Sequence, residues 1–303
     1  MTRRTLKSVS IVSYCVDRIA TVEAAWRDYL GYRTVARGEL RRDECAAWDT
    51  PDARGQTYCL MQPASEEPIY LRLIETGERL GYESPATCGW LATEMLVEDP
   101  DALARRLDGS PFELIGGPAN LFPGEKAARA MQMVGPSGQL LYFTRILPGG
   151  SRYGLKGARC EVDRPFIVAV AGAETSRMSA FYRDKLGMRV FEPIPFLNRI
   201  LARACRVSAD TIFATSVSPI PGRRFLVELD EFPSGTARRP RQPGQLPRGM
   251  SMVSFLTPDL DAVRVPFRAA PRTLETKPYD GRRSAVIEGP SGEWLELIED
   301  PAA

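Results

Sequence analysis

The chain of 303 residues contains no histidine. Histidine is the commonest metal-ligating side chain and the one whose unperturbed pKa lies closest to neutrality. Its absence excludes a Ser-His-Asp triad, a histidine-activated cysteine and any iron site held by imidazole ligands. Several large classes of enzyme chemistry are therefore closed to this protein.

Other features are also missing. No apolar run approaches the roughly 20 residues that span a bilayer, and the basic start lacks the apolar core of a signal peptide. The 40 basic and 38 acidic side chains nearly cancel, so no overall field attracts nucleic acid or an anionic membrane. The six cysteines are scattered without a Cys-x-x-Cys pair, which favours free thiols. We expect a cytoplasmic protein that binds neither nucleic acid nor membranes.

What the sequence does contain is a repeat. A Gly-Pro-Ser-Gly turn that leads into an alternating strand begins at residue 135 and again at residue 289, 154 residues later. Alternate residues of each strand face one surface, which carries Tyr142 in the first copy and Glu296 in the second. A Leu-Gly pair at 30–31 also recurs at 186–187. The chain is therefore a duplicated unit of about half its length.

The Leu-Gly pairs end predicted helices, and these helices precede the Gly-Pro-Ser-Gly turns and their strands. This pattern resembles the vicinal oxygen chelate superfamily, which includes glyoxalase I, the extradiol dioxygenases and the bleomycin-resistance proteins. The resemblance spans nearly the whole chain. It implies an α+β fold of two tandem glyoxalase-like domains, each made of two βαβββ modules that form a cupped mixed sheet. We expect the domains at 1–147 and 163–303, joined by a turn-rich linker at 148–162.

Four segments of the second half carry specific predictions. Residues 196–207 have apolar side chains at helical spacing, which predicts an amphipathic helix packed over the second cup or against a partner chain. Residues 232–244 are rich in Pro, Gly and Arg, so they form either a solvated connector or a clamp for a substrate anion. A helix is expected to start at residue 258, and a strand is expected at 189–192.

In the resembled family, four strand positions in each domain project into the cup. The resemblance places Ile11 or Ser13, Arg72, Ala92 and Tyr142 at these positions in the first domain. That set offers no carboxylate or imidazole for a divalent cation. In the second domain the positions hold Ile167, Glu228, Met252 and Glu296. Both histidine positions of an extradiol dioxygenase are thus apolar, and its iron triad is absent.

The two carboxylates of the second cup predict general acid–base catalysis by Glu296 and Glu228. The function expected from them is that of a lyase or isomerase of a small aromatic or carbonyl-bearing metabolite. Met252 and Ile167 would line the same cup, and Tyr279 and Arg282 would orient a bound oxyanion.

The alternative for either glutamate is an internal ion pair with Arg223, Arg282 or Arg283. The loop that carries Tyr279 and Arg282 can equally be an ordinary turn. In the first cup, Arg72 and Tyr142 would bind a carboxylate or a phenolate.

Two functions of other kinds stay open. The chain can be a non-catalytic protein that sequesters an aromatic small molecule, or a degenerate extradiol-dioxygenase homologue. No cofactor is predicted, although Mg²⁺ or Mn²⁺ held by oxygen ligands alone is compatible with the sequence. The expected partner is a small-molecule substrate, and a homodimer is open, as is the pairing of modules within one chain or between two.

Overall fold

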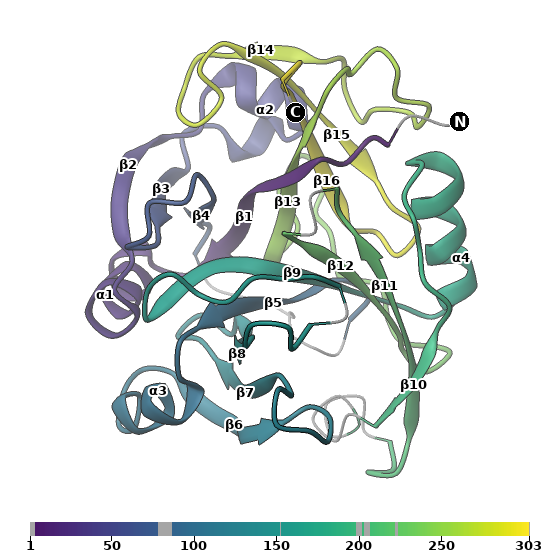
Figure 1. The fold of residues 1–303 in the computed structure, drawn as a ribbon. Coiled ribbons are helices and arrows are strands. Elements are labelled where there is room, and N and C mark those ends of the chain that lie inside the picture. Colours follow the sequence, from purple (N-terminus) through teal and green to yellow (C-terminus); the bar gives the residue numbers. More distant parts are fainter. Residues whose placement is uncertain are drawn as a thin grey trace.

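The computed structural model describes residues 4–77, 87–151, 153–197, 202, 207–221 and 224–302. Within these residues, the strands form two eight-stranded sheets, and α1, α3 and α4 lie toward the outside of the molecule (Figure 1). The predicted α+β architecture, with two cupped sheets that each combine two modules, is confirmed. In Figure 1, strands from the two ends of the chain, β1–β4 and β13–β16, share one sheet, and the strands from its middle, β5–β12, form the other.

The four modules follow one another along the chain. The first consists of β1 (Ser8–Val16), α1 (Ile19–Leu30), β2 (Arg33–Glu39), α2 (Arg42–Trp48), a 3₁₀ turn (Pro51–Ala53), β3 (Thr57–Gln62) and β4 (Tyr70–Glu75). The second consists of β5 (Gly89–Val97), α3 (Pro100–Arg106), β6 (Glu113–Asn120), β7 (Arg129–Val134) and β8 (Leu140–Arg145). The third consists of β9 (Val162–Gly172), α4 (Thr175–Ala180) with a π-helical end (Phe181–Lys185), β10 (Ile194–Leu197), β11 (Ile212–Pro219) and β12 (Leu226–Glu231). The fourth consists of β13 (Gly249–Thr257), β14 (Arg272–Leu274), β15 (Arg282–Glu288) and β16 (Trp294–Glu299).

The modules pair in a nested order. The first sheet, called sheet 1 below, has the order β14-β15-β16-β13-β1-β4-β3-β2, so it combines the first and fourth modules. Sheet 2 has the order β10-β11-β12-β9-β5-β8-β7-β6 and combines the second and third. The expectation that consecutive modules share a cup was therefore wrong. The predicted linker at 148–162 does separate β8 from β9, but strands on both of its sides belong to sheet 2.

The largest core cluster contains side chains from both sheets and from the helices. On β1, Val12 and Tyr14 belong to this cluster, whereas Ile11 and Cys15 belong to a second cluster on the opposite face. This alternation is the two-residue period of a strand that is buried on both faces. Contacts across the molecule reinforce the packing, because the Trp90 indole of β5 donates a hydrogen bond of 2.7 Å to the carbonyl of Trp294 on β16.

The second half departs from the sequence predictions in several places. The segment after residue 258 is a turn closed by a hydrogen bond from Val263 N to Leu260 O, and no helix starts there. Residues 189–192 are not a strand, and the edge strand β10 begins two residues later. Phe196 and Leu197 belong to β10, while Ile200, Leu201, Ala204 and Cys205 of the expected helix lie outside the described residues. Ala202, which is described, is buried against sheet 2.

The repeated Gly-Pro-Ser-Gly turns are built in the same way. In the second copy, the Glu293 carboxylate folds back and accepts a hydrogen bond of 2.9 Å from the Ser291 backbone. In the first copy, the Gln139 side chain accepts the matching bond of 3.0 Å from the Ser137 backbone. The last glycine of each turn has a positive φ, 87° at Gly292, which disfavours other residues there. The repeat in the sequence is therefore a repeat of backbone geometry.

Glu293 should make folding stability depend on pH. Burial raises the pKa of its carboxyl group from 4.5 to about 7. The neutral form therefore stabilises the fold fully below about pH 4.5, and this contribution is lost as the pH rises to about 7.

Glu293→Gln removes the titration and keeps the turn, since Gln139 fills the same role in the first copy. Across this pH range, we expect the free energy of unfolding to fall by on the order of 2–3 kcal/mol more in the wild type than in the variant. Urea denaturation at both ends of the range measures this difference, and parallel profiles would contradict it.

Candidate functional site

Strand register places equivalent residues at the inward positions of the two sheets. In sheet 1, Ser13 of β1 lies beside Arg72 of β4, and Ser254 of β13 lies beside Glu296 of β16. These four residues define the face called cup 1. The corresponding neighbours in sheet 2, which define cup 2, are Ala169 with Glu228 and Glu94 with Tyr142.

The register confirms that Tyr142 and Glu296 occupy equivalent inward positions. It also shows that Glu228 and Glu296 lie in different cups, so the prediction that they share one site was wrong.

In cup 1 the Glu296 carboxylate is fully buried and surrounded by donors. Its Oε1 accepts hydrogen bonds of 2.8 Å from the Trp48 indole, the Tyr279 hydroxyl and the Ser284 hydroxyl. Its Oε2 accepts a hydrogen bond from the Ser254 hydroxyl and a 3.3 Å ion-pair contact from Arg72. Such a carboxylate has no vacant direction from which a substrate could approach it.

Arg72 completes this network. Its Nη1 donates 2.6 Å to the Tyr279 hydroxyl, its Nε donates 3.0 Å to Ser13, and its guanidinium lies 4.6 Å from the centre of the Trp48 ring. The Arg72 and Glu296 side chains are 2% and 0% exposed, so the pair is removed from water. The alternative of an internal ion pair is therefore what the structure shows for Glu296. Its partner is Arg72 and neither Arg282 nor Arg283, while Arg223 lies outside the described residues.

Cup 1 is filled by a helix that the sequence analysis did not predict. The helix α2 follows β2 and packs against β14 and β15, on the inner side of sheet 1 (Figure 1). Its last residue, Trp48, is fully buried and contacts both Arg72 and Glu296. Tyr279 and Met252, predicted to contact substrate, are equally buried beside it. Arg282 lies on β15, partly exposed and outside this network.

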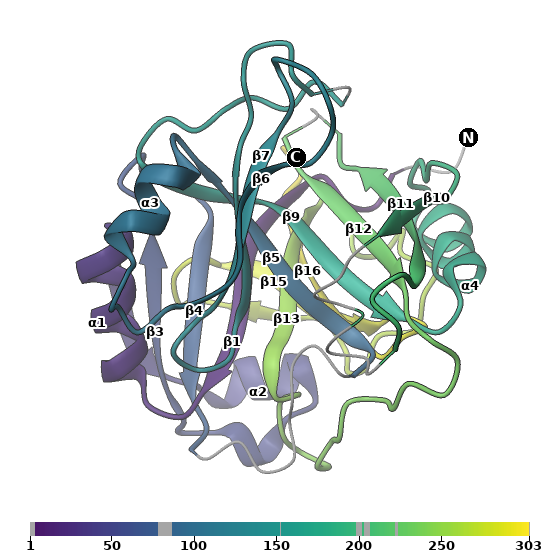
Figure 2. The ribbon, with the colours of Figure 1, turned by 90° about the horizontal axis from the view of Figure 1, so that it is seen from below.

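Cup 2 contains a cluster of acids at an opening. Its cavity has a volume of about 20 Å³, roughly the space of one or two water molecules. It is lined by Leu91, Ala92, Glu94, Tyr142, Ile167, Ala169, Glu228 and Asp230. Asp230 is nearly fully buried, whereas Glu94, Tyr142 and Glu228 are partly exposed at the mouth. Figure 2 views the molecule from the side on which the strands of sheet 2 lie in front.

All three acids of cup 2 favour the protonated form more than ordinary carboxyl groups. Burial raises the pKa of Glu94 to about 7, against an opposing hydrogen bond from Thr144. Burial raises the pKa of Asp230 to about 6, although the Thr215 hydroxyl donates to it at 2.8 Å. The pKa of Glu228 is raised well above its usual value by burial and by the neighbouring charges of Asp230 and Glu94. In this pair, the shared hydrogen bond raises the pKa of Glu228 and lowers that of Asp230, so Glu228 binds its proton more tightly than Asp230 does.

The two cups differ in charge because they have different residues at two equivalent strand positions. Where cup 1 has Arg72, cup 2 has Glu228, and where cup 1 has Glu296, cup 2 has Tyr142. The residues that line the cup 2 cavity include three acids and no lysine or arginine. Cup 1 thus neutralises its carboxylate internally, whereas the acids of cup 2 lack a basic neighbour in that lining.

Two acids of cup 2 were missed from the sequence. Glu94 is two residues beyond Ala92, the inward position predicted on β5, and Asp230 is two residues beyond Glu228 on β12. Residues two apart on a strand share a face. A signal was present, because Glu94 is the one charged residue of the strand Gly89–Val97. An isolated acid in an otherwise apolar, buried strand needs a hydrogen-bond partner or a proton.

A divalent metal does not fit these acids. Across the described residues, no three His, Cys, Asp or Glu side chains are grouped in a way that could hold an ion. In cup 2, Glu228 and Asp230 share a hydrogen bond, which takes up acceptor capacity that a metal would need.

We therefore expect elemental analysis of untagged protein to find no stoichiometric iron, zinc or nickel. One tightly bound ion per chain would contradict this.

Comparisons with known proteins identify the architecture. No protein-family profile and no curated protein sequence matches the chain. Glyoxalase I from Zea mays superposes with a TM-score of 0.63 and 12% identity, over 96% of this chain and 92% of that one. The chain has the vicinal oxygen chelate fold. A candidate dioxygenase from Bacillus subtilis superposes with a TM-score of 0.62 and 12% identity, over 99% of this chain and 87% of that one.

The vicinal oxygen chelate fold agrees with the resemblance drawn from the Leu-Gly and Gly-Pro-Ser-Gly motifs. At 12% identity, the likeness covers the course of the backbone, and the chemistry of each cup depends on this chain's own side chains. No described helix of this vicinal oxygen chelate fold is both long enough and apolar enough to cross a membrane.

Proposed function

We propose that the protein is an acid–base enzyme, a lyase or isomerase of a small carbonyl-bearing metabolite, and that its chemistry takes place in cup 2. The observation that carries this proposal is the set of three carboxyl groups, Glu94, Glu228 and Asp230, around one cavity. Their pKa values are raised toward neutrality, where a group can both accept and return a proton efficiently. Unlike Glu296, which pairs with Arg72, these three acids have no lysine or arginine in the lining of their cavity.

The three acids suit different roles. Glu94, whose pKa is about 7, takes a proton from a carbon atom next to the substrate carbonyl. Glu228 enters the reaction protonated and gives its proton to the carbonyl oxygen, so that the product of this step is an enol. In an isomerisation, Glu94 returns its proton to a neighbouring carbon; in an elimination, a leaving group departs from that carbon and takes the Glu94 proton. In both cases a carbonyl forms again and an enol hydroxyl returns its proton to Glu228. Asp230 acts through Glu228, because its ionised form accepts the Glu228 hydrogen bond.

The apolar part of cup 2 limits the substrate. Leu91, Tyr142 and Ile167 are the larger uncharged residues of its lining, which suits a flat aromatic or aliphatic group beside the carbonyl. The cavity of about 20 Å³ is smaller than such a molecule, so the substrate occupies the mouth as well, where Glu94, Tyr142 and Glu228 are partly exposed. A sequestering protein would need a larger aromatic lining than the single tyrosine found here.

The localisation and partners of the protein are inferred from the sequence. We infer a cytoplasmic protein with a small-molecule substrate, without a histidine-bound metal and without a nucleic-acid partner. The inference that the chain forms a homodimer stays a prediction. The pairing of modules is resolved in part, because one chain supplies both modules of each sheet.

Solvent deuterium exchange tests the proposal. Proton NMR in D₂O follows the loss of the hydrogen next to the carbonyl in a panel of small aryl ketones and 2-hydroxy ketones. We expect the protein to accelerate this exchange for at least part of the panel, because the same proton transfer begins both isomerisation and elimination. Rates equal to those in protein-free buffer across the panel would count against the proposal.

A further inference from the structure

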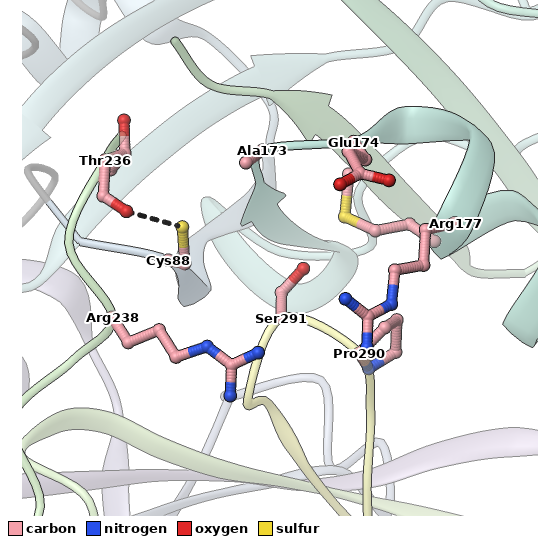
Figure 3. Close-up of a pocket in the computed structure, with 9 residues that line it drawn as sticks. Cys88, Ala173, Glu174, Arg177, Thr236, Arg238, Pro290 and Ser291 are labelled. Atoms are coloured by element: carbon pink, nitrogen blue, oxygen red, sulfur yellow. Dashed lines mark hydrogen bonds between the residues drawn. The ribbon is translucent and has the colours of Figure 1, made fainter. Parts of the chain in front are cut away.

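A second pocket lies apart from both cups, where three modules meet. Its walls come from the start of α4, from the connector at 236–238 and from the Gly-Pro-Ser-Gly turn at 289–292, with Cys88 on a fourth side (Figure 3). It shares no lining residue with the cup 2 cavity. The volume of about 100 Å³ exceeds the roughly 10–15 Å³ that a single water molecule needs, so a group of several atoms fits.

Two arginines reach this pocket from opposite sides. Figure 3 shows Arg177 and Arg238 extending toward Ser291 and Pro290. Among the described residues, neither guanidinium forms an ion pair or a side-chain hydrogen bond. Glu174 is the one acid in the lining, so the pocket carries more positive than negative charge.

The neighbouring arginines of the same segment differ from Arg238, because their guanidinium groups are held by the fold. Arg239 is buried and donates to the carbonyls of Met250 and Trp90, which ties the connector to both sheets. Arg241 pairs with Glu288 and also donates to the carbonyl of Gly292. Two of the three arginines between 238 and 241 thus stabilise the fold. Arg238 points instead into the pocket.

Ser291 adds a donor at the floor of the pocket. The residue is only 8% exposed, and its hydroxyl has no hydrogen-bond partner among the described residues. Gly172 leaves room for it, because a Cβ at that glycine would lie 2.1 Å from the Ser291 Oγ. In Figure 3 the hydroxyl points into the space between Cys88 and Glu174. The Ser291 hydroxyl lines the pocket and is therefore available to donate a hydrogen bond to a bound ligand.

We propose that this pocket binds the phosphate group of a small anion. Guanidinium groups bind phosphate through parallel, charge-assisted hydrogen bonds, and two of them match the charge of a phosphate dianion. The Ser291 hydroxyl supplies a third donor. An anion clamp is one of the two interpretations of residues 232–244, and Arg238 would be the residue of that segment that provides it.

Calorimetric titration with inorganic phosphate, at constant ionic strength set with sodium chloride, tests the proposal. The wild type should bind one phosphate per chain. Arg177→Gln and Arg238→Gln should each weaken binding about 10- to 100-fold, because each removes a charge-assisted contact. The matched control is Arg105→Gln on α3, an exposed arginine remote from the pocket lining, which should bind as the wild type does.

Three outcomes would overturn the proposal. One is the absence of saturable phosphate binding by the wild type. Another is equal affinity in Arg238→Gln and Arg105→Gln, with circular dichroism showing that both are folded. The third is acetate binding as tightly as phosphate, which would assign the pocket to carboxylates. Glu228→Gln should bind phosphate normally, so the result is independent of the chemistry proposed for cup 2.

Discussion

Replacing Arg72 with methionine is expected to reduce the free energy of unfolding by about 3–5 kcal/mol. The substitution leaves the Glu296 carboxylate buried, at 0% exposure, without its cation. It also removes the donors to Tyr279 and Ser13 and the contact with the Trp48 ring. A charge that stays buried after losing its partner costs far more than the intact pair contributes, because nothing replaces its lost hydration.

A double substitution separates the ion pair from simple loss of packing. Arg72→Met combined with Glu296→Leu removes both charges and should recover a large part of the lost stability. Arg282→Met is the matched control, since Arg282 lies partly exposed on the same sheet and should change stability by less than about 1 kcal/mol. Urea denaturation measures all three variants. If Arg72→Met is as stable as the control, cup 1 does not depend on this pair.

The largest expected effect on activity comes from Glu228→Gln. Glutamine keeps the shape of the side chain but has no carboxyl proton to give, whereas the raised pKa of Glu228 favours its protonated form. We expect the rate of enzyme-catalysed deuterium exchange to fall by about 10²- to 10⁴-fold, the usual contribution of a general acid or base. Stability should stay the same or rise, because the variant removes an acid from beside the like charges of Asp230 and Glu94.

Two further variants test whether cup 2 is the site. Glu113→Gln on β6 is the matched control, since that glutamate is exposed on sheet 2 and absent from the cavity lining, and it should leave exchange unchanged. Glu296→Gln addresses the catalytic role expected from the sequence. On the present account it lowers stability without slowing exchange per folded molecule. Exchange that depends on Glu296 and not on Glu228 would move the chemistry to cup 1.

The features that the sequence predicted well are local. The Gly-Pro-Ser-Gly turn is set by positive φ at glycine and by a side chain two residues on that bonds back to the turn, as Glu293 and Gln139 do. The strand that follows each turn alternates, so the inward positions of Tyr142 and Glu296 could be read directly. These patterns depend on residues only a few positions apart, so they can be recognised in a single sequence.

The pairing of modules could not be predicted in the same way. Each module presents a similar first strand to its partner, and the hydrophobic pattern of β1 does not distinguish β13 from β5 as its neighbour. Pairing is settled by contacts between residues more than two hundred positions apart, such as Trp48 with Glu296. Because the second module pairs with the third and the first with the fourth, Glu228 and Glu296 lie in different cups.

Two local errors then misplaced the site. The helix α2 has seven residues, too few for a convincing helical period, so Trp48 was not expected inside cup 1. On β5, the family resemblance gave Ala92 as the inward position and missed Glu94, although both residues lie on the same face. As a result, the sequence did not show that Trp48 fills cup 1, and Glu94 was missing from the predicted acids of cup 2.

The central claim is that cup 2 holds carboxyl groups poised to exchange protons near neutral pH. Carbon-13 NMR of protein labelled at the Glu and Asp carboxyl carbons, titrated with pH, measures this directly, and Glu94→Gln, Glu228→Gln and Asp230→Asn assign the signals. The account predicts that Glu94 titrates near pH 7 and Asp230 near pH 6, with Glu228 well above its usual range. If all three acids titrate at the ordinary values of exposed carboxyl groups, roughly pH 4, the claim is wrong.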